Sequence, residues 1–187
     1  RFPVEGGGES EVHGRYVYAA GGDPRHDHVV FHLSDGARVT YNDARRFGFM
    51  VMVPERELDS HPLFKGLGPE PLGAGFSPAY LAARAAGRKV NLKSLLMDQR
   101  VVAGLGNIYV SEALHRASLS PDRASATLAK HNGEPQPRTH ALVSAIRTVL
   151  EEAIAAGGST LRDYRHADGS EGAFQEAFRA YDREGEP

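Results

Sequence analysis

The segment Val101–Tyr109 reads Val-Val-Ala-Gly-Leu-Gly-Asn-Ile-Tyr and joins one helix-forming stretch to the next. Its two glycines, Gly104 and Gly106, permit positive backbone φ and close approach of another chain. Asn107 stands where the N-cap of the following helix is expected. Exposed N–H groups at a helix start bind phosphate oxygens. The segment is therefore either a phosphate-binding turn or a plain tight turn with a capping asparagine, because short glycine motifs leave both interpretations open.

Four helices are predicted around this segment. Ser77-Pro78 supplies an N-cap followed by proline at the first helical position, which predicts a helix to about residue 86. The helices at 92–97 and 108–117 flank the glycine turn. Gly157-Gly158 would cap a final helix at 139–156. That helix has the 3, 4, 7 spacing of one apolar face, formed by Leu142, Val143, Ile146, Val149, Leu150 and Ile154.

The first sixty residues are typical of β-structure. Runs of β-branched and aromatic residues predict strands at 15–18, 28–33, 37–41 and 48–53. Asp35-Gly36 predicts a hairpin turn between the second and third of these strands. Glycines and prolines between 62 and 75 indicate a domain boundary. We therefore expect an α+β protein. Its predicted parts are a β domain at 1–63, a linker at 64–76 and a helical domain at 77–187.

The composition excludes several classes of protein. The 187 residues are 41% hydrophobic and 25% charged, which is typical of a globular domain. No apolar run reaches the roughly 18 residues of a membrane span, and no signal-peptide pattern is present. The chain has no cysteine, which excludes disulfides and thiolate zinc sites within it.

The net charge of −2 is unevenly distributed, because the central part of the sequence is basic. Residues 82–130 hold eight Lys or Arg against three Asp or Glu, a local charge of +5 that leaves −7 for the rest of the chain. A basic face of this kind suits phosphate binding. A solvated helix surface explains the same residues.

Further motifs follow one another along the chain and resemble a known family. They are His26-Asp27-His28-Val29, Asp43-Ala44-Arg45-Arg46-Phe47-Gly48, Gly66-Leu67-Gly68-Pro69-Glu70-Pro71-Leu72, Gly157-Gly158-Ser159-Thr160-Leu161-Arg162-Asp163-Tyr164 and Gly172-Ala173-Phe174-Gln175. Together with residues 96–114 they resemble the formamidopyrimidine-DNA glycosylases, over nearly the whole chain. Val101–Tyr109 then resembles the loop of that family's helix-two-turns-helix module.

The resemblance implies an N-terminal antiparallel β-sandwich followed by a helical helix-two-turns-helix domain. It also implies a base-excision repair enzyme. Such an enzyme removes 8-oxoguanine and formamidopyrimidines from duplex DNA and cleaves the abasic site by β,δ-elimination.

Two segments of the family have no match in this sequence. The first is the N-terminal Pro-Glu-Leu-Pro-Glu-Val segment, whose proline amine is the nucleophile. We therefore expect an incomplete sandwich and no catalytic residue in this chain. The second is the C-terminal zinc finger, so the family's zinc has no ligands within residues 1–187 and we expect no metal site there.

The resemblance assigns two residues to the opened base stack. Arg45 resembles the arginine that pairs with the cytosine left behind by the extruded base, which a forked guanidinium suits. Phe47 resembles the aromatic wedge that replaces lost stacking. The alternatives are a surface ion pair for Arg45 and a core position for Phe47.

Other residues resemble the family's DNA contacts. Phosphate contacts are implied for His26, Lys89 and Asn107, with Lys93, Tyr109, Gly104 and Gly106 as further possible contacts. The loop over the oxidised purine is implied to include Gly158, Ser159, Thr160 and Tyr164, and an ordinary surface loop is the alternative. His26, His28 and His32 share a strand face, as metal ligands can, but no further ligand is spaced to complete a site.

We expect the partner to be double-stranded DNA containing oxidised purines. The full-length enzyme is expected to be a monomer in the bacterial cytoplasm, at the nucleoid, without membrane association. Two other functions stay open. One is an endonuclease VIII-type glycosylase for oxidised pyrimidines, against which Arg45-Arg46-Phe47 and the 157–164 loop argue. The other is a non-catalytic DNA-binding fragment, which a longer reading frame with proline after Met would exclude.

Overall fold

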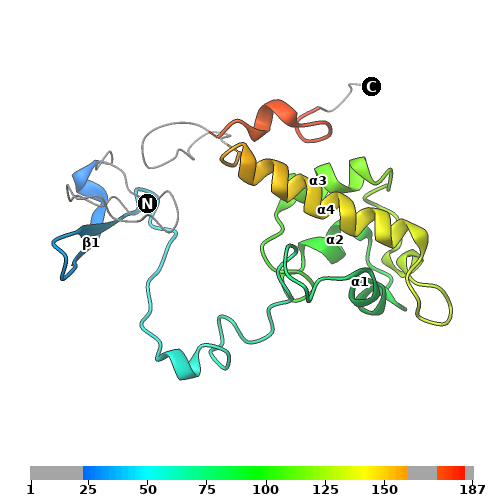
Figure 1. Cartoon of the computed structure of the whole chain (residues 1–187), viewed down its shortest axis with the longest axis horizontal. Coiled ribbons are helices and arrows are strands. Elements are labelled where there is room, and N and C mark those ends of the chain that lie inside the picture. Colours follow the sequence, from blue (N-terminus) through cyan, green and yellow to red (C-terminus); the bar gives the residue numbers. More distant parts are fainter. Residues whose placement is uncertain (1–22, 160–171, 184–187) are drawn as a thin grey trace. The chain divides into compact units, whose positions relative to one another are not determined.

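The computed structural model describes residues 23–159 and 172–183. They belong to two compact units: Arg1–Met52 with Gly157–Gln175, and Val53–Ala156 with Glu176–Pro187. Figure 1 shows the hairpin of the first unit in blue and the helices of the second in green to orange. Strands precede helices, so the α+β class is confirmed. The domain limits at 63 and 77 stay predictions. The predicted strand at 15–18 and the loop residues Thr160 and Tyr164 lie outside the described residues.

The first unit holds an antiparallel hairpin. β1 (Asp27–His32) pairs with β2 (Arg38–Asn42), with Phe31 opposite Val39. At the turn Gly36 has φ +89°, and Asp35 accepts a hydrogen bond from the Ala37 N–H at 2.9 Å. The Asp35-Gly36 hairpin is therefore confirmed, because glycine tolerates the positive φ that such a turn requires.

The predicted strand at 48–53 is wrong, since these residues form no strand. A strand needs a neighbour for its N–H and C=O groups, and the described residues offer it none. The Gly48 N–H instead donates to the Asp43 carboxylate at 2.8 Å. Phe49 and Met52 are exposed. The described residues contain one two-stranded sheet, and the β-sandwich stays a prediction.

Four helices build the second unit: α1 (Pro78–Ala85), α2 (Leu92–Met97), α3 (Asn107–Arg116) and α4 (Pro137–Ala155). α4 packs against α3 and α1, and α2 packs against α3 (Figure 1). Each helix buries one apolar stripe, and the fully buried side chains include Leu81, Leu95, Val110, Leu142 and Ile146. The described residues of both units also form four short 3₁₀ helices: η1 (Pro24–His26), η2 (Glu55–Glu57), η3 (Ser125–Leu128) and η4 (Phe174–Ala177).

The helix limits follow local chemistry. Ser77 caps α1 by accepting from the Tyr80 N–H at 3.1 Å, as predicted. α4 begins at Pro137, two residues before the predicted start, because proline suits the first helical position. Gly157 and Gly158 have φ values of +73° and +89°, which confirms that the glycine pair ends this helix.

Part of the predicted linker is bonded into the second unit. The Arg147 guanidinium on α4 donates to the carbonyls of Pro71 (3.3 Å), Gly73 (3.4 Å) and Phe76 (2.7 Å). Phe76 is fully buried. Residues 71–76 are therefore fixed to α4. Within the described ranges, none of the helices has the length and apolar character needed to cross a bilayer.

Candidate nucleic-acid interface

α3 begins without a side-chain cap. By contrast, Asn91 caps α2 by accepting from the Ser94 N–H at 2.8 Å. Gly106 is the N-cap of α3, with extended backbone, and Asn107 is already the first helical residue. The prediction that Asn107 caps this helix is therefore wrong, because a capping side chain must come from the extended residue before the first turn. The positive end of the α3 dipole stays open to an external anion.

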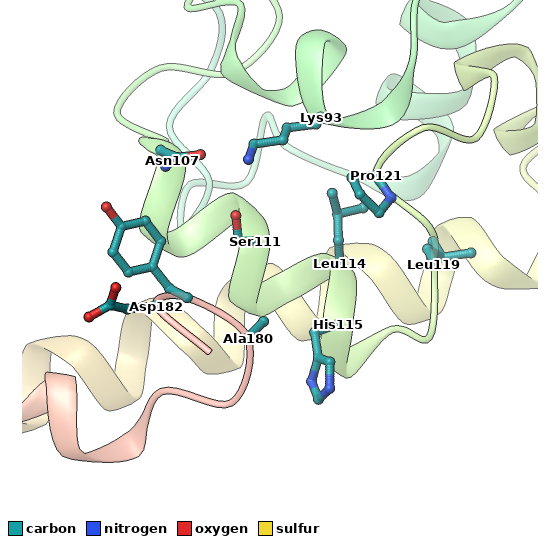
Figure 2. A pocket seen from close by; sticks show the side chains of 10 residues that line it. Lys93, Asn107, Ser111, Leu114, His115, Leu119, Pro121, Ala180 and Asp182 are labelled. Atoms are coloured by element: carbon teal, nitrogen blue, oxygen red, sulfur yellow. The ribbon is translucent and has the colours of Figure 1, made fainter. Parts of the chain in front are cut away.

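A pocket of about 480 Å³ lies beside the start of α3. Figure 2 shows the Lys93 ammonium extending from α2 toward Asn107 and Ser111. An ammonium, an amide and a hydroxyl next to a helix N-terminus are donors that suit a phosphate group. Asp182 also lines the pocket. An anion would therefore bind at the Lys93 end, away from this carboxylate.

Gln99 closes the turn between α2 and α3 from within. Its side-chain N–H groups donate to the carbonyls of Leu105 (2.9 Å) and Met97 (3.2 Å). Its side-chain oxygen accepts from the Gly104 N–H at 2.7 Å. One amide thus satisfies three backbone groups that the helices cannot, and it fixes the path of the chain into α3.

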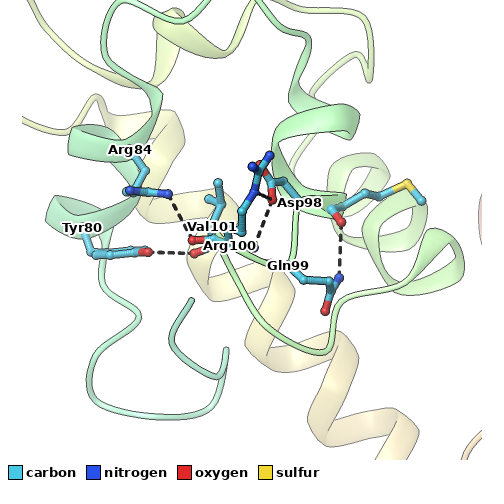
Figure 3. A network of polar contacts seen from close by, with 7 residues as sticks. Tyr80, Arg84, Asp98, Gln99, Arg100 and Val101 are labelled. Carbon is cyan, nitrogen blue, oxygen red and sulfur yellow. Dashed lines mark hydrogen bonds and ion pairs between the residues drawn. The ribbon is translucent and has the colours of Figure 1, made fainter. Parts of the chain in front are cut away.

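Two side chains of α1 hold the same turn from outside. The Tyr80 hydroxyl donates to the Val101 carbonyl at 2.9 Å, and the Arg84 guanidinium donates to the Arg100 carbonyl at 3.0 Å (Figure 3). Val101 and Val102 are fully buried. The turn is therefore part of the core of the second unit rather than a free surface loop.

Asp98 and Arg100 form an ion pair at the beginning of the turn. The Arg100 guanidinium donates to both carboxylate oxygens, at 2.9 and 3.0 Å (Figure 3). This bond, and next the Arg100 N–H bond to the same carboxylate, lowers the pKa of Asp98 to about 2. Arg100 is largely exposed, so solvent screens the pair and its main effect is to keep Asp98 ionised.

The structural constraints at three glycines of this region differ. A Cβ on Gly68 would lie 2.5 Å from the backbone carbonyl carbon and oxygen of Val101, so close packing requires glycine. Gly104 has φ +81°, a conformation that glycine adopts without strain. A Cβ on Gly106 would meet nothing within 4 Å, and its φ is −108°. Within the described residues, no steric need explains Gly106, although glycine is a favoured residue at an N-cap.

Glu112 is a fully buried carboxylate on α3. It accepts from the backbone N–H groups of Arg179 (2.9 Å), Ala180 (2.9 Å) and Tyr181 (2.9 Å). These bonds satisfy a charge that burial would otherwise penalise strongly. They also hold the segment that contributes Ala180, Tyr181 and Asp182 to the pocket. The sequence pattern did not single out Glu112, although a carboxylate beside Val110, Ala113 and Leu114 on the apolar stripe was a usable signal.

The proposed wedge residues lie in the first unit, directly after β2. Phe47 is 78% exposed, so it lies outside the core of the described residues. The Arg45 guanidinium lies over the Phe47 ring, 4.7 Å from its centroid, in a cation–π contact. Asp43 accepts from three backbone N–H groups of this loop, those of Arg45, Arg46 and Gly48. Sequence reasoning missed this role of Asp43, although aspartate before a turn favours such bonds.

The other predicted contacts are divided between the two units. His26 lies half-buried in η1, Lys89 is exposed between α1 and α2, and Tyr109 is half-buried in α3. Ser159 forms an isolated β-bridge with Ala173. The His28 ring donates through Nε2 to the Asp43 carbonyl at 2.9 Å. In the part of the chain that the structure describes, no three His, Cys, Asp or Glu residues are grouped as a metal site would need.

Two family models match this chain. The formamidopyrimidine-DNA glycosylase H2TH domain matches residues 67–165, and the N-terminal domain of the same enzymes matches residues 10–50. A formamidopyrimidine-DNA glycosylase from Azorhizobium caulinodans is 61% identical over 95% of this chain and 62% of its own length. One from Bradyrhizobium sp. is 58% identical over 95% of this chain and 60% of its own length. The chain thus spans about three fifths of the length of these curated relatives.

The similar solved structures are also proteins of this kind. The MutM (Fpg) protein from Thermus thermophilus has a TM-score of 0.74 and 39% identity, and the match covers 90% of this chain and 61% of that one. The Lactococcus lactis Fpg in complex with DNA containing an abasic site has a TM-score of 0.69 and 28% identity, over 86% of this chain and 56% of that one. Because the H2TH match alone spans more than half of the sequence, the chain belongs to the formamidopyrimidine-DNA glycosylase family.

Proposed function

We propose that the protein containing this chain excises oxidised purines from duplex DNA and cleaves the strand at the resulting abasic site. The observation that carries the proposal is the uncapped start of α3, open beside Lys93 and Asn107, in a chain of this family. The activity follows the name of the curated relatives. Related structures hold DNA containing N7-benzyl-Fapy-dG or an abasic site, which supports damaged duplex DNA as the partner.

The start of α3 would bind a DNA phosphate. A phosphate oxygen there accepts from backbone N–H groups of the first helical turn and gains from the helix dipole. The empty space beside Gly106 lets the phosphate approach the backbone. Lys93 supplies the positive charge, and Asn107 supplies a further donor. Because Gln99, Tyr80 and Arg84 fix the turn, little conformational entropy is lost when the phosphate binds.

The loop after β2 would fill the space that the extruded base leaves. An exposed phenylalanine ring can enter the base stack and replace lost stacking. Arg45 would offer its forked donors to the unpaired cytosine. The cation–π contact aligns the two side chains before DNA arrives. His26, Lys89, Tyr109 and Gly104 would add backbone contacts, and the loop of Gly158, Ser159, Thr160 and Tyr164 would cover the oxidised base.

The zinc of the family's finger does not fit the residues of this chain. The sequence contains no cysteine, and the described ranges hold no cluster suited to a metal. Residues 1–187 therefore supply no thiolate ligand to that zinc. The family's proline nucleophile has no match in this sequence either, so these residues would contribute DNA binding and base extrusion. We further propose a monomer that acts in the bacterial cytoplasm, where its DNA partner is found.

The test is excision by the protein expressed from its complete gene. Duplexes carrying 8-oxoguanine opposite cytosine, thymine glycol, or no lesion are compared, and borohydride is added to trap a Schiff base. We expect base release, strand cleavage and a trapped crosslink with 8-oxoguanine. Excision of thymine glycol alone would overturn the proposal in favour of the endonuclease VIII-type activity. Binding without excision of either lesion would overturn it in favour of a non-catalytic DNA-binding protein.

A further inference from the structure

Asp43 organises the loop that carries Arg45 and Phe47. Its Oδ1 accepts from the N–H groups of Arg45 (3.1 Å) and Arg46 (2.9 Å), and its Oδ2 accepts from the Gly48 N–H at 2.8 Å. The three donors belong to the residues around Phe47. One carboxylate therefore determines the backbone path of the whole loop.

Asp43 is itself anchored to the hairpin. Its N–H donates to the His26 carbonyl at 3.0 Å, and its carbonyl accepts from the His28 ring at 2.9 Å. The Tyr41 hydroxyl donates to Oδ2 at 3.1 Å. Asp43 thus connects η1 and β1 through its backbone, and β2 through its carboxylate, to a loop that has no strand pairing within the described residues.

The loop backbone has two features that need such a support. Arg46 has φ +54°, a conformation that costs a non-glycine residue energy and persists only when its surroundings enforce it. A Cβ on Gly48 would overlap the Tyr41 hydroxyl, so a larger residue there would displace the Tyr41 side chain that donates to Asp43. The Gly48 N–H bond is also the largest cause that lowers the pKa of Asp43 below its ordinary value. Asp43 is therefore an ionised acceptor at neutral pH.

We propose that Asp43 is the positioning residue of the wedge: its carboxylate holds Arg45 and Phe47 in the orientation that enters the base stack. The proposal rests on the proposed function, because it assigns the means by which the wedge is aimed. In this role Asp43 acts through the loop backbone, to which its carboxylate is bonded.

The test compares Asp43→Ala and Asp43→Asn with Asp35→Ala in the protein expressed from its complete gene. Asp35 is a matched control, because it also accepts a backbone N–H in a turn of the same hairpin but lies away from the wedge. Base unstacking is followed by the fluorescence of 2-aminopurine next to an abasic site at saturating protein. Excision of 8-oxoguanine is measured under single-turnover conditions. Hydrogen exchange of the loop amides is measured without DNA.

We expect Asp43→Ala to lose the unstacking signal and to slow excision about 10- to 100-fold, as misplacement of a positioned group does. The Arg45, Arg46 and Gly48 amides should exchange fast. Asp43→Asn keeps an acceptor for Arg45 and Arg46 but turns an N–H toward Gly48, so only the Gly48 amide should lose protection. Asp35→Ala should unstack and excise like the wild type.

Two results would overturn the proposal: unstacking and excision by Asp43→Ala equal to those of Asp35→Ala, or loop amides that stay protected in Asp43→Ala. Absence of excision by the wild type would instead contradict the proposed function. In that case amide exchange still decides whether Asp43 holds the loop.

Discussion

The two loops proposed to contact DNA are held in different ways. The turn at 98–106 is bonded by Gln99 from within and by Tyr80 and Arg84 of α1, and its valines are buried in the helical core. The loop at 43–48 follows a two-stranded hairpin, and the Asp43 carboxylate accepts from three backbone N–H groups of this loop. The first loop depends on tertiary packing, and the second depends on local hydrogen bonds.

This difference fits the two proposed tasks. A phosphate site gains from a rigid frame, because its donors must point at one position. A wedge must enter DNA, so its apolar side chain has to stay exposed, as Phe47 is. Substitutions should therefore affect stability in the second unit and base opening in the first.

The largest effect on stability is expected for Glu112→Ala. The change leaves three backbone N–H groups at 179–181 without their acceptor. Loss of hydrogen bonds to a buried charge should lower the free energy of unfolding by about 2–4 kcal/mol. Urea denaturation measures this, with Glu151→Ala, an exposed acid on α4, as the control. Equal midpoints for the two variants would show that the 179–181 segment is not held by Glu112.

Gly68→Ala should be the next most damaging change. The added methyl group would lie 2.5 Å from Val101 backbone atoms, and overpacking of this kind costs about 1–3 kcal/mol. The matched control is Gly106→Ala, whose methyl group meets nothing within 4 Å. We expect Gly106→Ala to melt close to the wild type but to bind duplex DNA more weakly. If both variants bound DNA like the wild type, the phosphate site would not be at Gly106.

A smaller effect is expected in the salt dependence of DNA binding. Each phosphate contact by a lysine contributes about 0.9 to the slope of log affinity against log salt. Lys89→Ala and Lys93→Ala should each reduce the slope by up to that amount, whereas Asn107→Ala should weaken binding without changing it. Lys65→Ala, an exposed lysine before the core of the second unit, should leave the slope unchanged. Slopes that do not separate Lys93→Ala from Lys65→Ala would remove Lys93 from the interface.

The smallest effect concerns Asp98 at acid pH. Its pKa is lowered from 3.8 to about 2 in the folded protein. The stabilisation is therefore complete above pH 3.8 and is lost as the pH falls through about 2. The difference in Tm between the wild type and Asp98→Asn should shrink between pH 5 and pH 2. An exposed acid of the same unit, tested as Asp122→Asn, is the control, and a constant difference for Asp98→Asn would show that the Arg100 pair adds nothing.

Local patterns predicted the helices well. Ser77 and the Gly157-Gly158 pair act within one turn of the helix ends that they determine, and Asp35-Gly36 acts in the same way on the hairpin turn. Pro137 was a local signal of the same kind, but the predicted start of α4 was two residues after it. The predicted N-cap of α3 was wrong by one residue, because Gly106 rather than Asn107 has the extended backbone of an N-cap. The strand at 48–53 was wrong because pairing needs a neighbour, which a local pattern does not supply.

The supports of the site were the least predictable part. Glu112 accepts hydrogen bonds from backbone groups that follow it by 67 to 69 positions in the sequence. Arg147 donates to the carbonyl of Phe76, which precedes it by 71 positions. Such side-chain bonds to distant backbone leave no periodic signal in the sequence. Asp43 acts on residues two to five positions ahead, so its role lay within reach of turn chemistry. The family resemblance predicted roles for the exposed residues Arg45, Phe47 and Asn107. The side chains that fix the two loops, such as Asp43 and Gln99, were identified only in the structure.

The most direct test of the division between the two loops measures affinity and base opening on one duplex. The wild type, Asn107→Ala and Phe47→Ala are titrated onto DNA with an abasic site and an adjacent 2-aminopurine. We expect Asn107→Ala to bind more weakly yet to give full unstacking at saturation. Phe47→Ala should bind close to the wild type and lose the unstacking signal at saturation. If both variants lost affinity and unstacking in the same proportion, or neither did, the two loops would not have separate roles.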